Sequence, residues 1–171
     1  VVVDILNNMN EKTIKKETIF EGRSVHLTVH TVEGPKGVTT REVIDHSPAV
    51  TIIPFQAPDT IYLIHQFRKA TEQVLVEAPA GCIEPNEDPD IAAKRELQEE
   101  TGFDAQVVTK MSEMYMAPGF CNEYMHIYVA EGLREGATNF DHDETMELHR
   151  YTIDDVAKMI KNKQIIDAKT I

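Results

Sequence analysis

Three glutamates stand close together in the segment 95–100, which reads RELQEE. An α-helix turns by about 100° per residue, so Glu96 and Glu100 would lie about 40° apart on one face, with Glu99 beside them. Like charges at that spacing repel each other by about a few tenths of a kcal/mol. A divalent cation reverses this repulsion, and Mg²⁺ binds proteins through one or two carboxylates plus substrate phosphates. The segment therefore predicts a helix that holds Mg²⁺, and the alternative is a solvated acidic helix face.

The neighbouring residues predict how this helix is positioned. Arg95 stands four residues before Glu99, so its guanidinium can pair with that carboxylate and fix its orientation. Ala93 and Leu97 fall on another face and predict the buried side of the helix. Gly102 follows where a left-handed C-terminal cap is expected.

The segment 81–89 contains two prolines and one glycine, so it predicts a loop leading into the helix. Loop and helix together carry the pattern G-x5-E-x7-R-E-L-x-E-E-x-G-F. Its fixed positions are Gly81, Glu87, Arg95, Glu96, Leu97, Glu99, Glu100, Gly102 and Phe103.

This pattern resembles the Nudix box at every defining position. The resemblance implies a Mg²⁺-dependent hydrolase, with Mn²⁺ as the alternative ion, that acts on a nucleoside diphosphate linked to another moiety. It also implies an α/β/α sandwich with a mixed sheet. The implied metal ligands are Glu96, Glu99, Glu100 and the carbonyl of Ala80.

The composition limits the class of protein. The chain has 171 residues, of which 42% are hydrophobic and 27% charged, as in one globular domain. Asp and Glu outnumber Lys and Arg by 29 to 17, and a net charge of −12 argues against a nucleic-acid partner. Two cysteines give no disulfide framework. Without an apolar run of membrane-spanning length or a secretory signal at 1–16, we expect a cytoplasmic protein with no membrane partner.

The first part of the chain predicts a β-hairpin. Residues 18–32 alternate in part, and Val25, Leu27 and Val29 form the face expected to be buried. A turn at 33–37 leads to a second strand over 38–45. We therefore expect two domains: an N-terminal extension with the hairpin over 1–45, and the hydrolase domain over 46–171.

The remaining patterns predict the elements around the acidic helix. The apolar runs 49–55 and 60–66 predict core strands joined by a turn at 57–59. Further strands are expected over 75–77, 104–113 and 124–131. Residues 152–162 predict an amphipathic helix capped by Thr152 or Asp154.

Segments outside the box resemble the ADP-ribose pyrophosphatase branch of the Nudix hydrolases. They are 66–68, 77–84, and 117–120 with Glu123. Pro118 lies close to the position of that branch's marker proline, and the resemblance extends from about Thr18 onward. It implies hydrolysis of ADP-ribose and related nucleoside diphosphate sugars to a nucleoside monophosphate and a sugar phosphate. The alternatives are GDP-mannose, NADH or a dinucleoside polyphosphate as main substrate, or a Nudix fold that senses a nucleotide without cleaving it.

In that branch the enzyme is a homodimer whose N-terminal hairpin helps to form the partner's substrate site. The resemblance therefore implies a homodimer in which residues 20–41 contact the base bound by the other subunit. Base stacking needs an aromatic ring, and the chain has no Trp, so Phe20 is the candidate.

Four more residues complete the predicted substrate site. Arg68, at the end of a strand, can bind a phosphate bidentately, unless it is an ordinary surface arginine. Arg41 is a second candidate of the same kind. Gly119 belongs to the 117–120 segment, and Glu123 is expected to contact the sugar.

Hydrolysis also needs a base that orients or deprotonates the attacking water. The acidic segment 141–147 follows a stretch with two glycines and resembles the mobile loop that carries the base in that branch. Glu144 is the first choice, followed by Glu147 and Asp143, and the alternative is a solvated acidic turn. Glu99 and Arg95 complete the predicted catalytic residues.

Overall fold

The computed structural model describes residues 9–136 and 146–171. The chain divides into two compact units. The smaller unit combines the described part of residues 1–46 with the segment Tyr115–Glu123. The main unit combines Ser47–Met114 with the described part of Tyr124–Ile171.

The smaller unit is built on a three-stranded antiparallel sheet in the order β1-β2-β3. Its strands are β1 (Lys12–Glu21), β2 (His26–Gly34) and β3 (Gly37–Asp45). The single strand predicted over 18–32 is therefore wrong. The chain reverses after Glu21, where the Gly22 amide donates to the Val25 carbonyl at 2.9 Å. The second turn lies where it was predicted, and Gly37 there has a φ of 103°, which favours glycine.

The face of β2 predicted to be buried is also wrong. Thr28 and Val32 are buried, whereas Val25 is 39% exposed. The hydroxyl of Thr28 donates to the Val43 carbonyl at 3.3 Å, so this polar side chain is satisfied without water. Every residue of β1 is exposed in the single chain, which explains why its sequence carries no alternating pattern.

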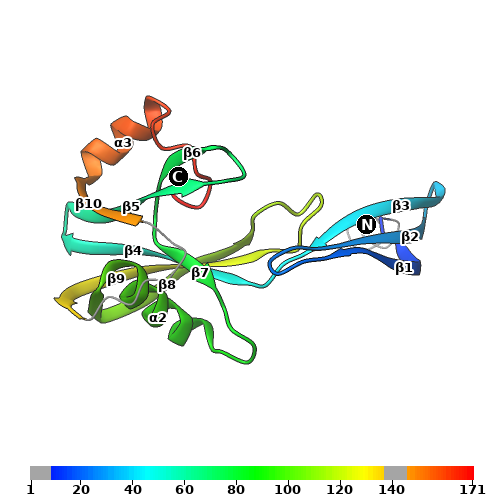
Figure 1. Cartoon of the computed structure of the whole chain (residues 1–171), viewed down its shortest axis with the longest axis horizontal. Helices are drawn as coiled ribbons and strands as arrows, with labels where there is room; N and C mark the ends of the chain where they lie inside the picture. The colour runs from blue at the N-terminus through cyan, green and yellow to red at the C-terminus, as the bar shows by residue number, and fades with distance from the viewer. Residues whose placement is uncertain (1–8, 137–145) are drawn as a thin grey trace, which may run out of the picture. The chain divides into compact units, whose positions relative to one another are not determined.

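The main unit contains a seven-stranded mixed sheet (Figure 1). Its central path runs β10-β5-β4-β9-β8, while β6 pairs with β5 and β7 with β4. The pair β4–β9 is parallel, and the pairs of β5 with β4, β6 and β10 are antiparallel. The strands are β4 (Ala49–Ala57), β5 (Thr60–Arg68), β6 (Gln73–Glu77), β7 (Ala80–Cys82), β8 (Phe103–Tyr115), β9 (Tyr124–Glu135) and β10 (Met146–Thr152).

Two helices cover opposite faces of this sheet, and Figure 1 shows α3 and α2 on its two sides. Helix α2 (Pro89–Thr101) packs Ala93 and Leu97 against Val50 and Ile52 of β4. Helix α3 (Ile153–Lys161) packs Val156 against Ile61 and Leu63 of β5. The predicted α/β/α sandwich with a mixed sheet is confirmed.

The sequence analysis predicted the N-terminal cap of α3 but missed the strand β10 before it. Thr152 caps α3 as expected, since its hydroxyl accepts from the Asp155 amide at 3.1 Å. Strand β10 was not predicted, because its start was assigned to an acidic loop. No helix in the described part of the chain is long and apolar enough to cross a membrane.

Candidate active site

Helix α2 is fixed at both ends by local interactions. The Asp88 side chain accepts from the Asp90 amide at 2.8 Å, and Pro89 occupies the first turn, where no amide donor is needed. At the other end Gly102 has a φ of 73°, and its amide donates to the Gln98 carbonyl. The predicted left-handed cap is thereby confirmed.

The helix carries its glutamates between the core and the surface. Glu96 and Glu100 are only 8% and 7% exposed, whereas the Glu99 side chain is 35% exposed. Buried carboxylates are costly unless they are paired, so each of them needs a donor or a cation.

Arg95 supplies donors to three carboxylates at once. Its Nε and Nη2 each lie 2.8 Å from an oxygen of Glu87, in a bidentate pair. Its Nη1 lies 2.7 Å from Glu96 and 2.9 Å from Glu99, and Nη2 also donates to the Cys82 carbonyl at 3.0 Å. The expected pairing of Arg95 with Glu99 is confirmed. We call Arg95 with Glu87, Glu96, Glu99 and Glu100 the α2 carboxylate cluster.

The pKa values of the cluster reflect its charge balance. Hydrogen bonds from Arg95 lower the pKa of Glu87 to about 2. The pKa of Arg95 is raised, first by its bonds to Glu87. Burial raises the pKa of Glu96, and the hydrogen bond from Arg95 offsets this rise only in part. The cluster holds four carboxylates and one guanidinium, which donates to three of them, so its negative charge exceeds its positive charge.

Strand β7 holds the backbone close to these carboxylates. The Ala80 amide donates to Glu100 Oε2 at 2.8 Å. A Cβ at Gly81 would lie only 2.1–2.2 Å from the carboxylate atoms of Glu96. A side chain at position 81 would therefore displace the Glu96 carboxylate from its place in the cluster.

The ligand atoms available at this site fit a hard divalent cation. Two buried carboxylates and one half-exposed carboxylate lie next to a backbone segment, so the atoms that could bind a metal are oxygens. Mg²⁺ and Mn²⁺ prefer such oxygen ligands. The raised pKa of Glu96 is the second observation that fits, because a cation would stabilise its ionised form.

Residues 45–171 match the family model described as the NUDIX domain. This chain belongs to the Nudix family. It is 43% identical over 164 residues to a methanol dehydrogenase activator from Bacillus methanolicus, an alignment that covers 94% of this chain and 89% of that protein. It is 39% identical over 168 residues to an ADP-ribose pyrophosphatase from Bacillus subtilis (strain 168), covering 96% and 91%. A crystal structure of an ADP compounds hydrolase is similar with a TM-score of 0.82 at 26% identity, covering 95% and 89%.

A second charged cluster is centred on Glu77, the last residue of β6. Glu77, 1% exposed, accepts from Arg68 Nε and Nη2 at 2.8 Å each and also from the Lys169 ammonium. Asp167 lies 2.9 Å from Lys169 and 2.6 Å from the hydroxyl of Thr170. We call these five residues the Glu77 cluster.

The Glu77 cluster was missed by the sequence analysis. Its link to the site is the Thr170 hydroxyl, which accepts from the Ala78 amide at 2.8 Å, two residues before Ala80. The available signal was a single acid, Glu77, at the end of the otherwise apolar segment Leu75–Ala78, since a buried acid needs partners. Arg68 lies 9 residues before Glu77, but Lys169 lies 92 residues after it, where no local pattern indicates the pairing.

The predicted substrate residues lie in several places. Two donors of Arg68 are engaged by Glu77. In the smaller unit, Arg41 and Gly119 line the same pocket of about 420 Å³. Arg41 Nε donates there to Glu11 at 3.0 Å. Phe20 is 57% exposed and does not line this pocket.

The remaining predicted residues divide between described and undescribed parts of the chain. Glu123 lies 3.7 Å from His46 Nδ1 within the smaller unit. Asp143 and Glu144 lie outside the described residues. Glu147 belongs to β10, where it is paired with His65 of β5. Asp143, Glu144 and Glu147 stay predictions as the catalytic base, and Glu123 stays a prediction as a sugar contact.

Proposed function

We propose that this Nudix hydrolase cleaves the pyrophosphate bond of ADP-ribose and related nucleoside diphosphate sugars with Mg²⁺. The observation that carries the proposal is the α2 carboxylate cluster, whose carboxylates exceed its cations. The 39% identity to an ADP-ribose pyrophosphatase over most of both chains supports the substrate class. On ADP-ribose the products are AMP and ribose 5-phosphate.

Glu96, Glu99, Glu100 and the carbonyl of Ala80 would hold the cation. When bound, it neutralises charge on the diphosphate oxygens and lowers the pKa of a coordinated water. Arg95 holds the carboxylates of Glu96 and Glu99 in fixed orientations.

The chain's own residues would then move one proton. Water attacks one phosphorus, the bond from that phosphorus to the bridging oxygen breaks, and a base takes the proton from the water. Glu144 is our first choice for this base, followed by Asp143. Glu147 is the third choice, because its side chain lies with that of His65 on the face of the sheet that α3 covers, opposite helix α2.

The test is a product assay with ADP-ribose and Mg²⁺, using Glu100→Gln as the variant. AMP and ribose 5-phosphate are expected from the wild type, and kcat of the variant should fall by about 10²–10³-fold, the usual effect of removing one electrostatic contact to the reacting group. Glu131→Gln is the matched control, since Glu131 is an exposed glutamate of β9. Binding of ADP-ribose without release of AMP would instead show a nucleotide sensor.

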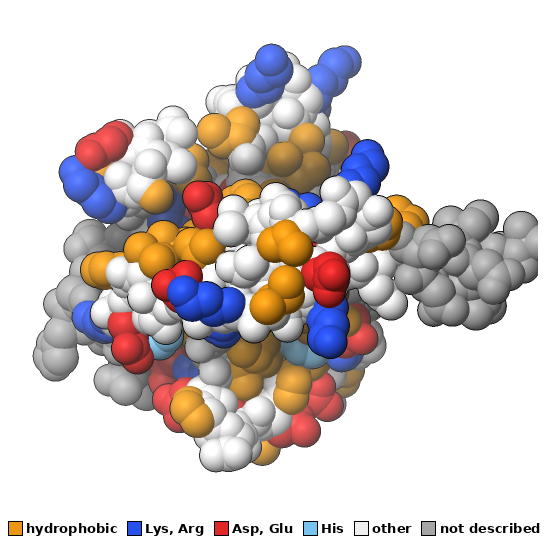
Figure 2. All heavy atoms as spheres, turned by 90° about the vertical axis from the view of Figure 1, so that its right-hand side faces the viewer, with side chains coloured by type: hydrophobic (Ala, Val, Ile, Leu, Met, Phe, Trp, Pro, Cys, Tyr) orange, Lys and Arg blue, Asp and Glu red, His pale blue; other side chains and the backbone are white. Residues whose placement is uncertain are grey.

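We also propose a homodimer in which the three-stranded sheet meets the partner. Large apolar side chains of the smaller unit are exposed: Ile14, Ile19, Phe20, Val25 and Val38. Figure 2 shows such hydrophobic side chains at the surface among charged ones. Exposed apolar groups of this kind mark interaction surfaces. Light scattering after size exclusion would give twice the chain mass, and Ile19→Lys with Val38→Lys would give a monomer.

Within this proposal, the pocket of the smaller unit receives part of the nucleotide. Its volume of about 420 Å³ suits a small ligand. Arg41 would exchange Glu11 for a phosphate. Phe20 and Glu123 do not line this pocket, so in the proposed dimer Phe20 would stack on the base bound by the other subunit and Glu123 would contact the sugar outside the pocket. Arg41→Gln should raise KM for ADP-ribose while leaving the unfolding temperature unchanged. Arg68 stays a weaker candidate, because Glu77 already engages its guanidinium.

The 43% identity to a methanol dehydrogenase activator favours a second candidate function. Many dehydrogenases use a nicotinamide dinucleotide, whose two nucleotides are joined by the same kind of pyrophosphate bond. The substrate panel should therefore include NADH and GDP-mannose beside ADP-ribose. A higher kcat/KM for NADH than for ADP-ribose would make the dinucleotide the main substrate. We place the protein in the cytoplasm, where the thiols of Cys82 and Cys121 would stay reduced.

A further inference from the structure

Three potential metal ligands meet on the face of the sheet that α3 covers. Strands β5 and β10 are antiparallel, with His65 opposite Glu147 and Leu63 opposite His149. Side chains two residues apart share a face of a strand, so His65 shares the face of Leu63, and His149 shares that of Tyr151. Leu63 and Tyr151 pack with the apolar residues of α3. Because α2 packs on the other face, these residues are separate from the α2 carboxylate cluster.

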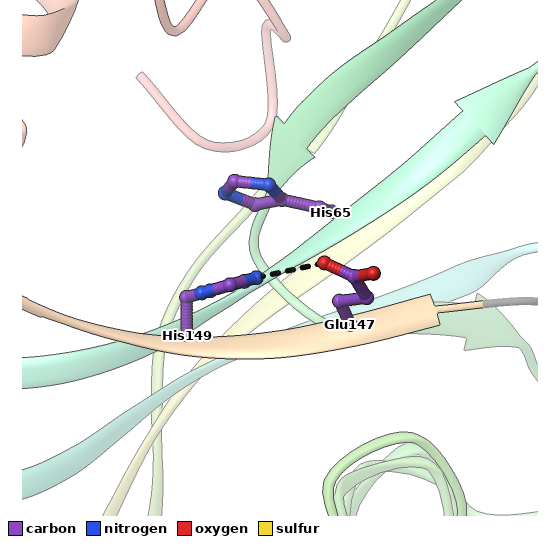
Figure 3. Close-up of side chains that lie close together, drawn as sticks. All are labelled: His65, Glu147 and His149. Atoms are coloured by element: carbon purple, nitrogen blue, oxygen red, sulfur yellow. Dashed lines mark hydrogen bonds and ion pairs between the residues drawn. The ribbon is translucent and has the colours of Figure 1, made fainter.

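The three side chains converge. One ligand atom from each of His65, Glu147 and His149 lies within 4.8 Å of the other two. Figure 3 shows the rings of His65 and His149 one above the other, with Glu147 beside His149. The ring centroids are 4.2 Å apart, and His149 Nε2 lies 3.2 Å from Glu147 Oε2.

One of the rings is held from outside the group. The hydroxyl of Tyr151 lies 2.7 Å from His65 Nε2 and fixes the orientation of that ring. Metal-bound imidazoles usually have such an outer hydrogen-bond partner. Burial, and after it the nearby His149, lower the pKa of His65. Both effects favour the neutral ring, which is the form that binds a metal.

We propose that His65, Glu147 and His149 form a second metal site, which takes Zn²⁺ or a similar transition-metal ion. Two imidazoles and one carboxylate form a ligand set typical of zinc sites with one open position. The oxygen donors at α2 suit Mg²⁺ instead, so the two sites differ in the class of ion they select.

The geometry needs only small side-chain movements to close around an ion. Zinc bonds of about 2.0–2.2 Å place tetrahedral ligand atoms about 3.3–3.6 Å apart. A present separation of 4.8 Å, the upper bound here, would therefore shorten by about 1.2–1.5 Å. The side chains of Glu147 and His149 are 75% and 42% exposed, so both have room to rotate.

The test is a Zn²⁺ titration of the full chain by calorimetry in excess Mg²⁺, which occupies the α2 carboxylate cluster. The wild type should bind one tight equivalent of Zn²⁺. His65→Gln and His149→Gln should each weaken this binding by more than about 100-fold, because even outer partners of metal ligands contribute about 10–100-fold. Tyr151→Phe should weaken it by about tenfold.

His46→Gln is the matched control, because His46 also lies beside a glutamate, Glu123, but in the smaller unit. It should leave Zn²⁺ binding unchanged. Co²⁺ provides a second readout, since its visible spectrum reports imidazole ligands that His149→Gln removes. Two results would overturn the proposal. One is Zn²⁺ binding that persists in both the His65→Gln and the His149→Gln variant. The other is wild-type Zn²⁺ binding that excess Mg²⁺ abolishes. Neither result depends on hydrolysis of ADP-ribose.

Discussion

The two charged clusters of the main unit differ in charge balance, because the Glu77 cluster holds two carboxylates and two cations and the α2 carboxylate cluster holds four carboxylates and one cation. In the Glu77 cluster, one carboxylate with 1% exposure accepts hydrogen bonds from the guanidinium of Arg68 and the ammonium of Lys169. In the α2 carboxylate cluster, the guanidinium of Arg95 is shared among three carboxylates. The first cluster is complete without a ligand. The second has more negative charge than its own described residues neutralise.

The pKa values of the two central glutamates express this difference. Burial raises the pKa of Glu77, but the hydrogen bonds from Arg68 and the charge of Lys169 outweigh it, so the net shift is downward. For Glu96 burial also raises the pKa, and Arg95 does not reverse the rise. A buried acid with a lowered pKa is typical of a structural ion pair. An acid with a raised pKa beside other acids indicates a place for an absent cation.

The largest effect is expected from Glu77→Gln. The change leaves the Arg68 guanidinium, whose side chain is 36% exposed, beside a neutral amide, and leaves the buried Lys169 ammonium with Asp167 as its carboxylate. Breaking a buried ion pair costs about 3–5 kcal/mol, and because of this exposure and the remaining Asp167 we expect the lower end, about 3 kcal/mol. Urea unfolding at neutral pH should show this loss in the free energy of unfolding. The exposed control Glu131→Gln should change it by less than about 0.5 kcal/mol. Equal effects of the two changes would contradict a structural role for Glu77.

Glu96→Gln should have the reverse profile. It removes a carboxylate whose charge is incompletely compensated, so the free energy of unfolding in the absence of divalent cations should stay equal or rise. The kcat for ADP-ribose with Mg²⁺ should fall by about 10²–10³-fold, which is about 2.7–4 kcal/mol in the barrier. A Glu96→Gln variant with a lower free energy of unfolding and an unchanged kcat would contradict the catalytic role assigned to the α2 carboxylate cluster.

A smaller effect is expected from pH. The folded-state pKa of Glu77 lies below its ordinary value of 4.5, so its ionised form stabilises the fold above about pH 4.5. That contribution is lost as the pH falls through the folded-state pKa. The difference in unfolding free energy between wild type and Glu77→Gln should therefore be constant near neutrality and shrink below about pH 4.5. A difference that grows on acidification would reverse the sign of the assigned pKa shift.

The sequence predicts local parts of this molecule better than distant pairings. Helix α2 and its Gly102 cap could be predicted because the acidic spacing, the glycine and the buried Leu97 all lie within a few turns. Strand β1 could not, because all its residues are exposed in the single chain. The buried face of β2 was also wrong, since the burial of Thr28 depends on the Val43 carbonyl of another strand.

The same distinction separates the parts of the candidate site. The spacing of Glu96, Glu99 and Glu100 is visible along the chain, and so is the glycine at 81. The bond of Lys169 to Glu77 joins residues 92 positions apart. The meeting of His65 with His149 depends on the register of β5 and β10. Interactions of this kind depend on how distant segments pair in the folded chain, which a local sequence pattern does not encode.

The smallest effect is expected from Thr170→Val, which tests how the Glu77 cluster supports the site. The valine keeps the shape of Thr170 but leaves the buried Ala78 amide without its acceptor, which costs about 1–3 kcal/mol of unfolding free energy. Ala78 lies two residues before Ala80, whose amide holds Glu100, so kcat should also fall severalfold with KM unchanged. Thr109→Val, at an exposed position of β8, is the control and should leave both quantities unchanged. A loss of stability with full kcat would limit the Glu77 cluster to folding, and a loss of both would show that the end of the chain positions Glu100.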